Sequence, residues 1–86
     1  MMPEPAITFY GTHWSPDCRR SRQFLGEHQI PYRWVDIGQD KEGEQVVIQA
    51  NDGKRIIPTI VFEDGSFLVE PSNAELAAKL NLKMKA

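Results

Sequence analysis

The sequence holds a single cysteine among its 86 residues, so no disulfide can form within the chain. It lacks any apolar run of the roughly 20 residues that cross a bilayer, and residues 1–5 have neither the basic start nor the apolar stretch of a secretion signal. Positive charge is not in excess, because 10 Lys and Arg stand against 12 Asp and Glu. We therefore expect a cytoplasmic protein that has no disulfide framework and binds neither nucleic acid nor membrane.

The composition that remains is that of an ordinary globular domain, with 41% hydrophobic and 26% charged residues. The length allows one domain over residues 1–86, and its ends at 1–5 and 83–86 are expected to fray. A chain this short buries only about 60–65% of its extended surface, so its core is thin. Nothing in the sequence requires more than a monomer.

A strand and a helix are predicted in the first third of the chain. Residues 6–10 are rich in β-branched and aromatic side chains, which favours a strand. Ser15-Pro16-Asp17 predicts a helix start, because it supplies a capping hydroxyl, a proline at the first helical position and a carboxylate near the positive end of the dipole. This helix should run to about His28, before Pro31 breaks it.

The rest of the chain predicts two more helices and three more strands. In chain order we expect a strand over 32–37; a helix over 41–50 capped by Asp40, weakened by Gly43 and anchored by Val46, Val47 and Ala50; strands over 60–62 and 67–69 joined by the two-residue turn Asp64-Gly65; and a helix behind the capping box Ser72–Glu75.

The resulting order is β-α-β-α-β-β-α, which defines an α/β fold. Two strands joined by a helix are expected to be parallel with a right-handed crossover, and two strands joined by a short turn are antiparallel. The chain should therefore form a mixed four-stranded sheet with helices on both faces.

The loop 12–18 is the predicted position of the chemistry, because sites of open α/β sheets lie at the carboxyl ends of parallel strands. It holds the only cysteine, Cys18, and one of two tryptophans, Trp14. The helix dipole would stabilise a Cys18 thiolate, while Asp17 would oppose it. As the third helical residue, Cys18 should be partly covered. The residues expected to assist the thiolate are Arg19, Arg20 and Arg22.

Plainer interpretations of the same residues stand beside this one. Ser15 is a good helix cap, and a lone cysteine such as Cys18 is often a small buried apolar residue. A hydrolase triad of His13, Ser15 and Asp17 fails, because residues two apart in a tight turn cannot align a base between nucleophile and carboxylate. His13, Cys18 and His28 have no recognisable metal-ligand spacing, so no metal site is expected.

Four segments together carry a family resemblance: 10–18 (YGTHWSPDC), 57–59 (IPT), 64–65 (DG) and 70–73 (EPSN). In this order and spacing they resemble the glutaredoxin family, and the small bacterial mycoredoxins in particular. The resemblance implies a thioredoxin-like fold and thiol–disulfide exchange. It also implies no bound cofactor, with glutathione or a similar low-molecular-weight thiol as co-substrate and disulfide-containing proteins as partners.

The chain departs from the family at the Cys-x-x-Cys motif, which falls on Ser15-Pro16-Asp17-Cys18. Ser15 stands at the nucleophile position, and a hydroxyl cannot form a disulfide. Only Cys18, the family's resolving position, could then react, by a monothiol route with external glutathione. The alternatives are a Cys→Ser engineered form of a dithiol enzyme, a non-catalytic module that binds a peptide or glutathione, and a homodimer linked through Cys18. Iron–sulfur ligation by the first motif cysteine is not expected.

The other site residues are implied by the resemblance alone. Ile57-Pro58 corresponds to the family's cis-proline, and the backbone before the proline pairs with the substrate. Thr12 stands where the family often has a lysine, so one anion contact is missing. The remaining residues are Arg55 (beside Lys54) for one glutathione carboxylate, the backbone N–H groups of Ser72 and Asn73 for the second, and Trp14, Pro16 and Asp17 around the reacting sulfur.

Overall fold

The computed structural model describes residues 5–82, and the predicted order of elements is confirmed. The expected frayed ends, 1–4 and 83–86, lie outside the described residues. The elements are β1 (Thr8–Gly11), α1 (Pro16–Glu27), β2 (Arg33–Asp36), α2 (Lys41–Ala50), β3 (Thr59–Val61), β4 (Phe67–Val69) and α3 (Asn73–Lys79).

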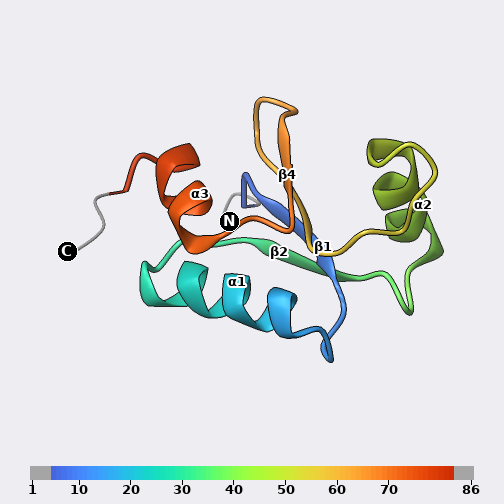
Figure 1. Ribbon diagram of the computed structural model, residues 1–86, viewed down its shortest axis with the longest axis horizontal. Coiled ribbons are helices and arrows are strands. Elements are labelled where there is room, and N and C mark those ends of the chain that lie inside the picture. Colours follow the sequence, from blue (N-terminus) through green and yellow to red (C-terminus); the bar gives the residue numbers. More distant parts are fainter. Residues whose placement is uncertain (1–4, 83–86) are drawn as a thin grey trace, which may run out of the picture.

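The four strands form one sheet in the order β2-β1-β3-β4 (Figure 1). β1 and β2 are parallel, and the other two neighbouring pairs are antiparallel, as predicted. Phe9 on β1 belongs to a core that also contains Leu25 of α1 and Leu76 of α3. The next residue, Tyr10, points to the opposite face, where it approaches α2 at Gly43. Helices therefore cover both faces of the sheet.

The packing of α2 differs from the prediction. Val47 is fully buried, but Val46 is 38% exposed and does not anchor the helix. Gly43, predicted only to weaken the helix, is buried at its point of contact with the sheet. A Cβ atom at this position would lie 2.6 Å from Cγ1 of Val35, so the glycine permits the close approach of helix and strand.

The β3–β4 hairpin is also built differently from the prediction. Its loop has three residues, 63–65, because the Phe62 N–H donates to the carbonyl oxygen of Ser66 at 2.8 Å. The Gly65 N–H donates to the Phe62 carbonyl oxygen at 2.9 Å, and Gly65 has φ = +86°. A turn followed by a left-handed glycine is typical of three-residue hairpin loops, so the expected two-residue turn was wrong.

The helices between residues 5 and 82 are too short or too polar to cross a lipid bilayer.

Candidate active site

Three loops meet at one edge of the sheet. Tyr10 at the end of β1 pairs with Thr59 at the start of β3, and Thr59 also pairs with Val69 at the end of β4. Residues 12–15, 57–58 and 70–72 follow or precede these paired positions, and we call them the active-site edge. The strand pairing thus brings the three loop segments together, although they are far apart in the sequence.

Ser15 begins α1 as predicted. Its hydroxyl oxygen accepts a hydrogen bond from the Cys18 N–H at 3.3 Å, and its carbonyl oxygen accepts from the Arg19 N–H at 3.0 Å. Pro16 occupies the first turn, where a missing N–H costs nothing, and Asp17 places a carboxylate near the positive end of the dipole. Ser15 itself is only 6% exposed. The motif therefore forms a well-capped helix start.

Cys18 is completely buried, with no exposed surface, rather than partly covered as predicted. It belongs to the main core together with Phe9 and Leu25. Its Sγ atom lies so close to Gly11 that a Cβ atom there would be 2.6 Å from the sulfur. The thiol is thus enclosed between the first turn of α1 and the end of β1.

Two of the arginines expected to assist the thiolate are engaged elsewhere. Arg20 forms an ion pair with Asp17 at 3.0 Å and donates to the Pro71 carbonyl oxygen at 3.4 Å. The Arg22 guanidinium lies 4.1 Å from the ring centroid of Trp34. Arg20 therefore ties the start of α1 to the loop before α3, and Arg22 ties the helix to β2.

The Ile57–Pro58 peptide bond is cis, as the resemblance implied. Pro58 is fully buried, and its carbonyl oxygen accepts a hydrogen bond from the Glu70 N–H at 2.9 Å. Within residues 5–82, Ile57 makes no backbone hydrogen bond through its own N–H or carbonyl group. The N–H and carbonyl groups of Ile57 are therefore left to pair with an extended partner at the active-site edge.

The residues expected to hold carboxylates already contact acidic side chains of the chain itself. Arg55 Nε donates to Oε2 of Glu44 at 2.8 Å. The Ser72 N–H donates to Oε1 of Glu75 at 2.9 Å, and the Ser72 hydroxyl accepts from the Glu75 N–H at 3.1 Å. The predicted capping box is thus present, and it occupies an N–H group that the resemblance assigns to a ligand.

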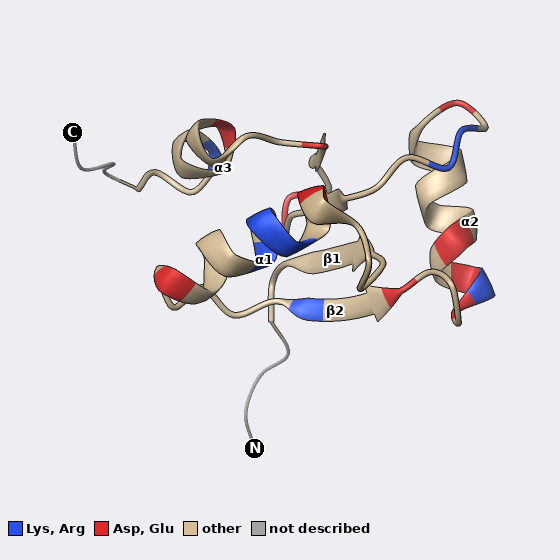
Figure 2. Cartoon of the chain, turned by 60° about the horizontal axis from the view of Figure 1, so that its bottom comes forward, with Lys and Arg blue, Asp and Glu red and all other residues tan. Residues whose placement is uncertain are grey.

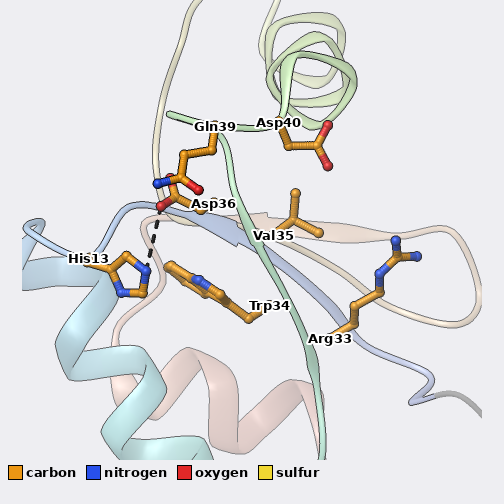
Figure 3. A pocket seen from close by; sticks show the side chains of 7 residues that line it. All are labelled: His13, Arg33, Trp34, Val35, Asp36, Gln39 and Asp40. Carbon is orange, nitrogen blue, oxygen red and sulfur yellow. Dashed lines mark ion pairs between the residues drawn. The ribbon is translucent and has the colours of Figure 1, made fainter.

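His13 and Trp14 are the exposed residues of segment 12–15 in the active-site edge. Trp14 is 71% exposed, the most exposed large apolar side chain in the described part of the chain. His13 Nε2 lies 3.6 Å from Asp36 Oδ2, and its ring centroid lies 5.1 Å from that of Trp34 (Figure 3). These contacts hold the loop after β1 against the end of β2. They lie beside a polar cavity of about 360 Å³. Figure 3 draws the side chains that line this cavity.

Sequence reasoning missed Trp34 and Asp36 as neighbours of the site. The signal was available, because the carboxyl ends of two parallel strands meet at the same edge, and Gly11 and Asp36 are register partners. His13 contacts neither of the partners considered for it in a metal site. Among residues 5–82, no group of three His, Cys, Asp or Glu side chains is placed to hold a metal ion.

The fold and the cis-proline edge define a thioredoxin-like protein. A mutant of the thioredoxin-like protein BC3987 superposes with a TM-score of 0.80 at 22% identity, covering 91% of this chain and 97% of that one. The glutaredoxin of Archaeoglobus fulgidus superposes with a TM-score of 0.71 at 19% identity, covering 88% and 86%.

Sequence similarity gives the family. The Glutaredoxin family model matches residues 7–68. Mycoredoxin 1 of Corynebacterium glutamicum is 38% identical over 74 residues, which are 86% of this chain and 91% of that protein. The chain belongs to the glutaredoxin family, and this membership supports a glutaredoxin-like redox function.

Proposed function

We propose that this chain carries out thiol–disulfide exchange with Cys18 as its only redox-active residue. The observation that carries the proposal is that the sole cysteine of a glutaredoxin-family chain stands in the first turn of α1, directly behind the active-site edge. Ser15 holds the position of the usual nucleophile and has no sulfur, so a dithiol cycle cannot run.

The exchange proceeds in two balanced steps. The Cys18 thiolate attacks one sulfur of a substrate disulfide, forms a mixed disulfide and releases the other sulfur as a thiolate. Where the half bound to Cys18 is a low-molecular-weight thiol, a second molecule of that thiol then attacks its sulfur as a thiolate, which restores the Cys18 thiolate and yields the symmetrical disulfide of the thiol. The two electrons come from two molecules of this thiol, one of which arrived in the substrate disulfide, in keeping with a family that uses glutathione or mycothiol as co-substrate.

Burial makes this reaction depend on local opening. Cys18 has no exposed surface, so a disulfide reaches its sulfur only when the first turn of α1 moves away. The Ser15 cap is the hydrogen bond that must break first, and an N-cap stabilises a helix by about 1 kcal/mol. Helix ends open locally at free energies far below that of global unfolding.

Substrate recognition falls to the active-site edge. The Ile57 N–H and carbonyl groups offer a donor and an acceptor to an extended thiol-containing chain, and the exposed Trp14 ring offers an apolar contact in another segment of the same edge. A disulfide-containing protein or a low-molecular-weight thiol fits this arrangement.

Alkylation of Cys18 in the folded protein tests the opening step. The rate of labelling by iodoacetamide should be slow in buffer and nearly independent of urea below the unfolding transition, because a local opening exposes little surface. If the labelling rate instead increases with urea as steeply as the equilibrium constant of global unfolding, iodoacetamide reaches Cys18 only in the unfolded chain.

That second outcome would favour a different function, which the full burial of Cys18 supports. The chain would then be a binding module that retains the active-site edge without exchange chemistry. Such a module binds thiol-containing ligands without covalent adducts, and binding measured with a ligand that has no reactive sulfur would persist.

A further inference from the structure

Both carboxylate contacts that the resemblance implies are satisfied from within the chain. Glu44 Oε2 lies 2.8 Å from Arg55 Nε, and Glu75 Oε1 accepts a hydrogen bond from the Ser72 N–H at 2.9 Å. A ligand carboxylate would have to displace one of these side chains or share its partner. Arg55 and the Ser72 N–H are therefore already engaged, and Lys54 and the Asn73 N–H are the implied groups that keep no such contact among residues 5–82.

Glu70 adds an acidic side chain directly at the active-site edge. Its N–H donates to the carbonyl oxygen of Pro58 at 2.9 Å, so the residue is fixed beside the cis-proline. The side chain is exposed and forms no ion pair with any residue between 5 and 82. Its carboxylate is thus available to a partner bound at the edge.

The backbone of Glu70 is in the left-handed region, with φ = +48°, a conformation that glycine adopts most readily. Gln29, Asp52 and Asn81 share this conformation outside the active-site edge, so it does not by itself mark a site. At position 70 the residue that adopts it carries a charge beside the cis-proline.

Arg20, which reaches the residue after Glu70, is already paired with an acidic side chain. Arg20 donates to the carbonyl oxygen of Pro71, the residue after Glu70, but its guanidinium is paired with Asp17 at 3.0 Å. In Figure 2, acidic positions mark both the first turn of α1 and the loop that leads into α3. Among the residues of the active-site edge itself, Glu70 is the only Lys, Arg, Asp or Glu, while exposed Arg19 and Lys54 lie in the flanking segments.

We propose that Glu70 is a specificity-determining residue that makes the active-site edge select thiol partners with basic groups beside the sulfur over partners with carboxylates there. This inference rests on the proposed recognition at the active-site edge, but not on the reactivity of Cys18. The substrate class is a cysteine or disulfide within a basic segment.

Non-covalent binding tests this selection without any exchange step. S-methylglutathione has two carboxylates and no reactive thiol, and its dimethyl ester has the same shape without those two charges. Their dissociation constants can be compared by NMR titration, with the Ile57 amide as the reporter of the active-site edge. We expect the ester to bind ~3-fold or more tightly than the acid, since an exposed charge pair is worth up to about 1 kcal/mol.

Two variants separate Glu70 from the overall charge. In Glu70→Gln the ratio of the dissociation constant of the acid to that of the ester should fall at least halfway toward one. Added salt should lower this ratio in the same way in the unaltered chain, because it screens the charge of Glu70. Glu63→Gln removes an equal charge from the exposed loop at the other end of the β3–β4 hairpin and should leave the ratio unchanged.

The outcomes distinguish the two proposals. Tighter binding of the acid, or an equal response to Glu70→Gln and Glu63→Gln, would overturn the selection while the binding edge stands. Failure of both ligands to shift the Ile57 amide would overturn recognition at the active-site edge, and the selection with it.

Discussion

The sulfur of Cys18 lies directly against the backbone of Gly11. A Cβ atom built on Gly11 would lie 2.6 Å from Sγ, 3.2 Å from the Phe9 ring and 3.3 Å from the Trp34 ring. These three neighbours are buried or half-buried, so none can move aside without disturbing the core. The only thiol of the chain is therefore a packing element of the fold as well as its one candidate for redox chemistry.

Gly11→Ala should destabilise the protein by about 1–3 kcal/mol, the usual cost of forcing an extra carbon into a packed core. Urea unfolding followed by tryptophan fluorescence measures the change. Gly26→Ala is a matched control, since a Cβ atom there meets nothing within 4 Å and alanine is the better residue in a helix. The control should gain about 0.5–1 kcal/mol. A Gly11→Ala protein as stable as the original would contradict the packing described.

A double-mutant cycle tests whether Cys18 is the atom in the way. Cys18→Ala removes the sulfur and leaves room for a methyl group at position 11. We expect the Gly11→Ala, Cys18→Ala protein to be more stable than the sum of the single changes predicts, by at least about 0.5 kcal/mol. Strictly additive effects would mean that the two residues do not compete for space.

Gly43→Ala should destabilise the protein although the residue lies within a helix. The added carbon would meet Cγ1 of Val35 at 2.6 Å and push α2 from the sheet. We expect a loss of about 1–3 kcal/mol in urea unfolding, opposite in sign to Gly26→Ala. A gain in stability would show that α2 does not approach β2 this closely.

Local signals made much of this fold predictable. The Ser15 cap and the Ser72–Glu75 capping box each depend on residues three apart, and both are present as predicted. The exposure of Val46 and the full burial of Cys18 depend on how a helix sits against the sheet, which helix periodicity alone does not specify. The His13–Asp36 pair joins residues 23 positions apart. It follows from the parallel pairing of β1 and β2, not from any short motif.

Asp64 should make stability depend on pH in the acid range. Hydrogen bonds from the Ser66 hydroxyl and N–H lower the pKa of the Asp64 carboxyl from 3.8 to about 2, with a smaller contribution from Lys79. Because the pKa is lower in the folded state, the stabilisation is present above about pH 4 and is lost as the pH falls toward 2. NMR titration of the Asp64 carboxyl checks the value, and Ser66→Ala should raise it. An unchanged pKa in that variant would contradict the assigned cause.

Ser15→Cys should create a fast-reacting thiol at the start of α1. A cysteine at a helix N-terminus has a lowered pKa, so more thiolate is present at neutral pH. We expect alkylation of the Ser15→Cys, Cys18→Ala protein near pH 7 to be at least ~10-fold faster than that of a free cysteine. Ser15→Ala, which removes the cap alone, should cost about 1 kcal/mol of stability. A slow thiol at position 15 would mean that the active-site edge does not activate a nucleophile.

The most direct test of the central claim is the intact mass of the unaltered protein after incubation with oxidised glutathione and, separately, with the cationic disulfide cystamine. Cys18→Ala and the double variant Ser15→Cys, Cys18→Ala are run beside it. We predict a slowly formed single adduct on the unaltered chain, reversed by reduced glutathione and absent from Cys18→Ala. No adduct on the folded unaltered chain, beside a rapid one on the double variant, would contradict exchange through Cys18.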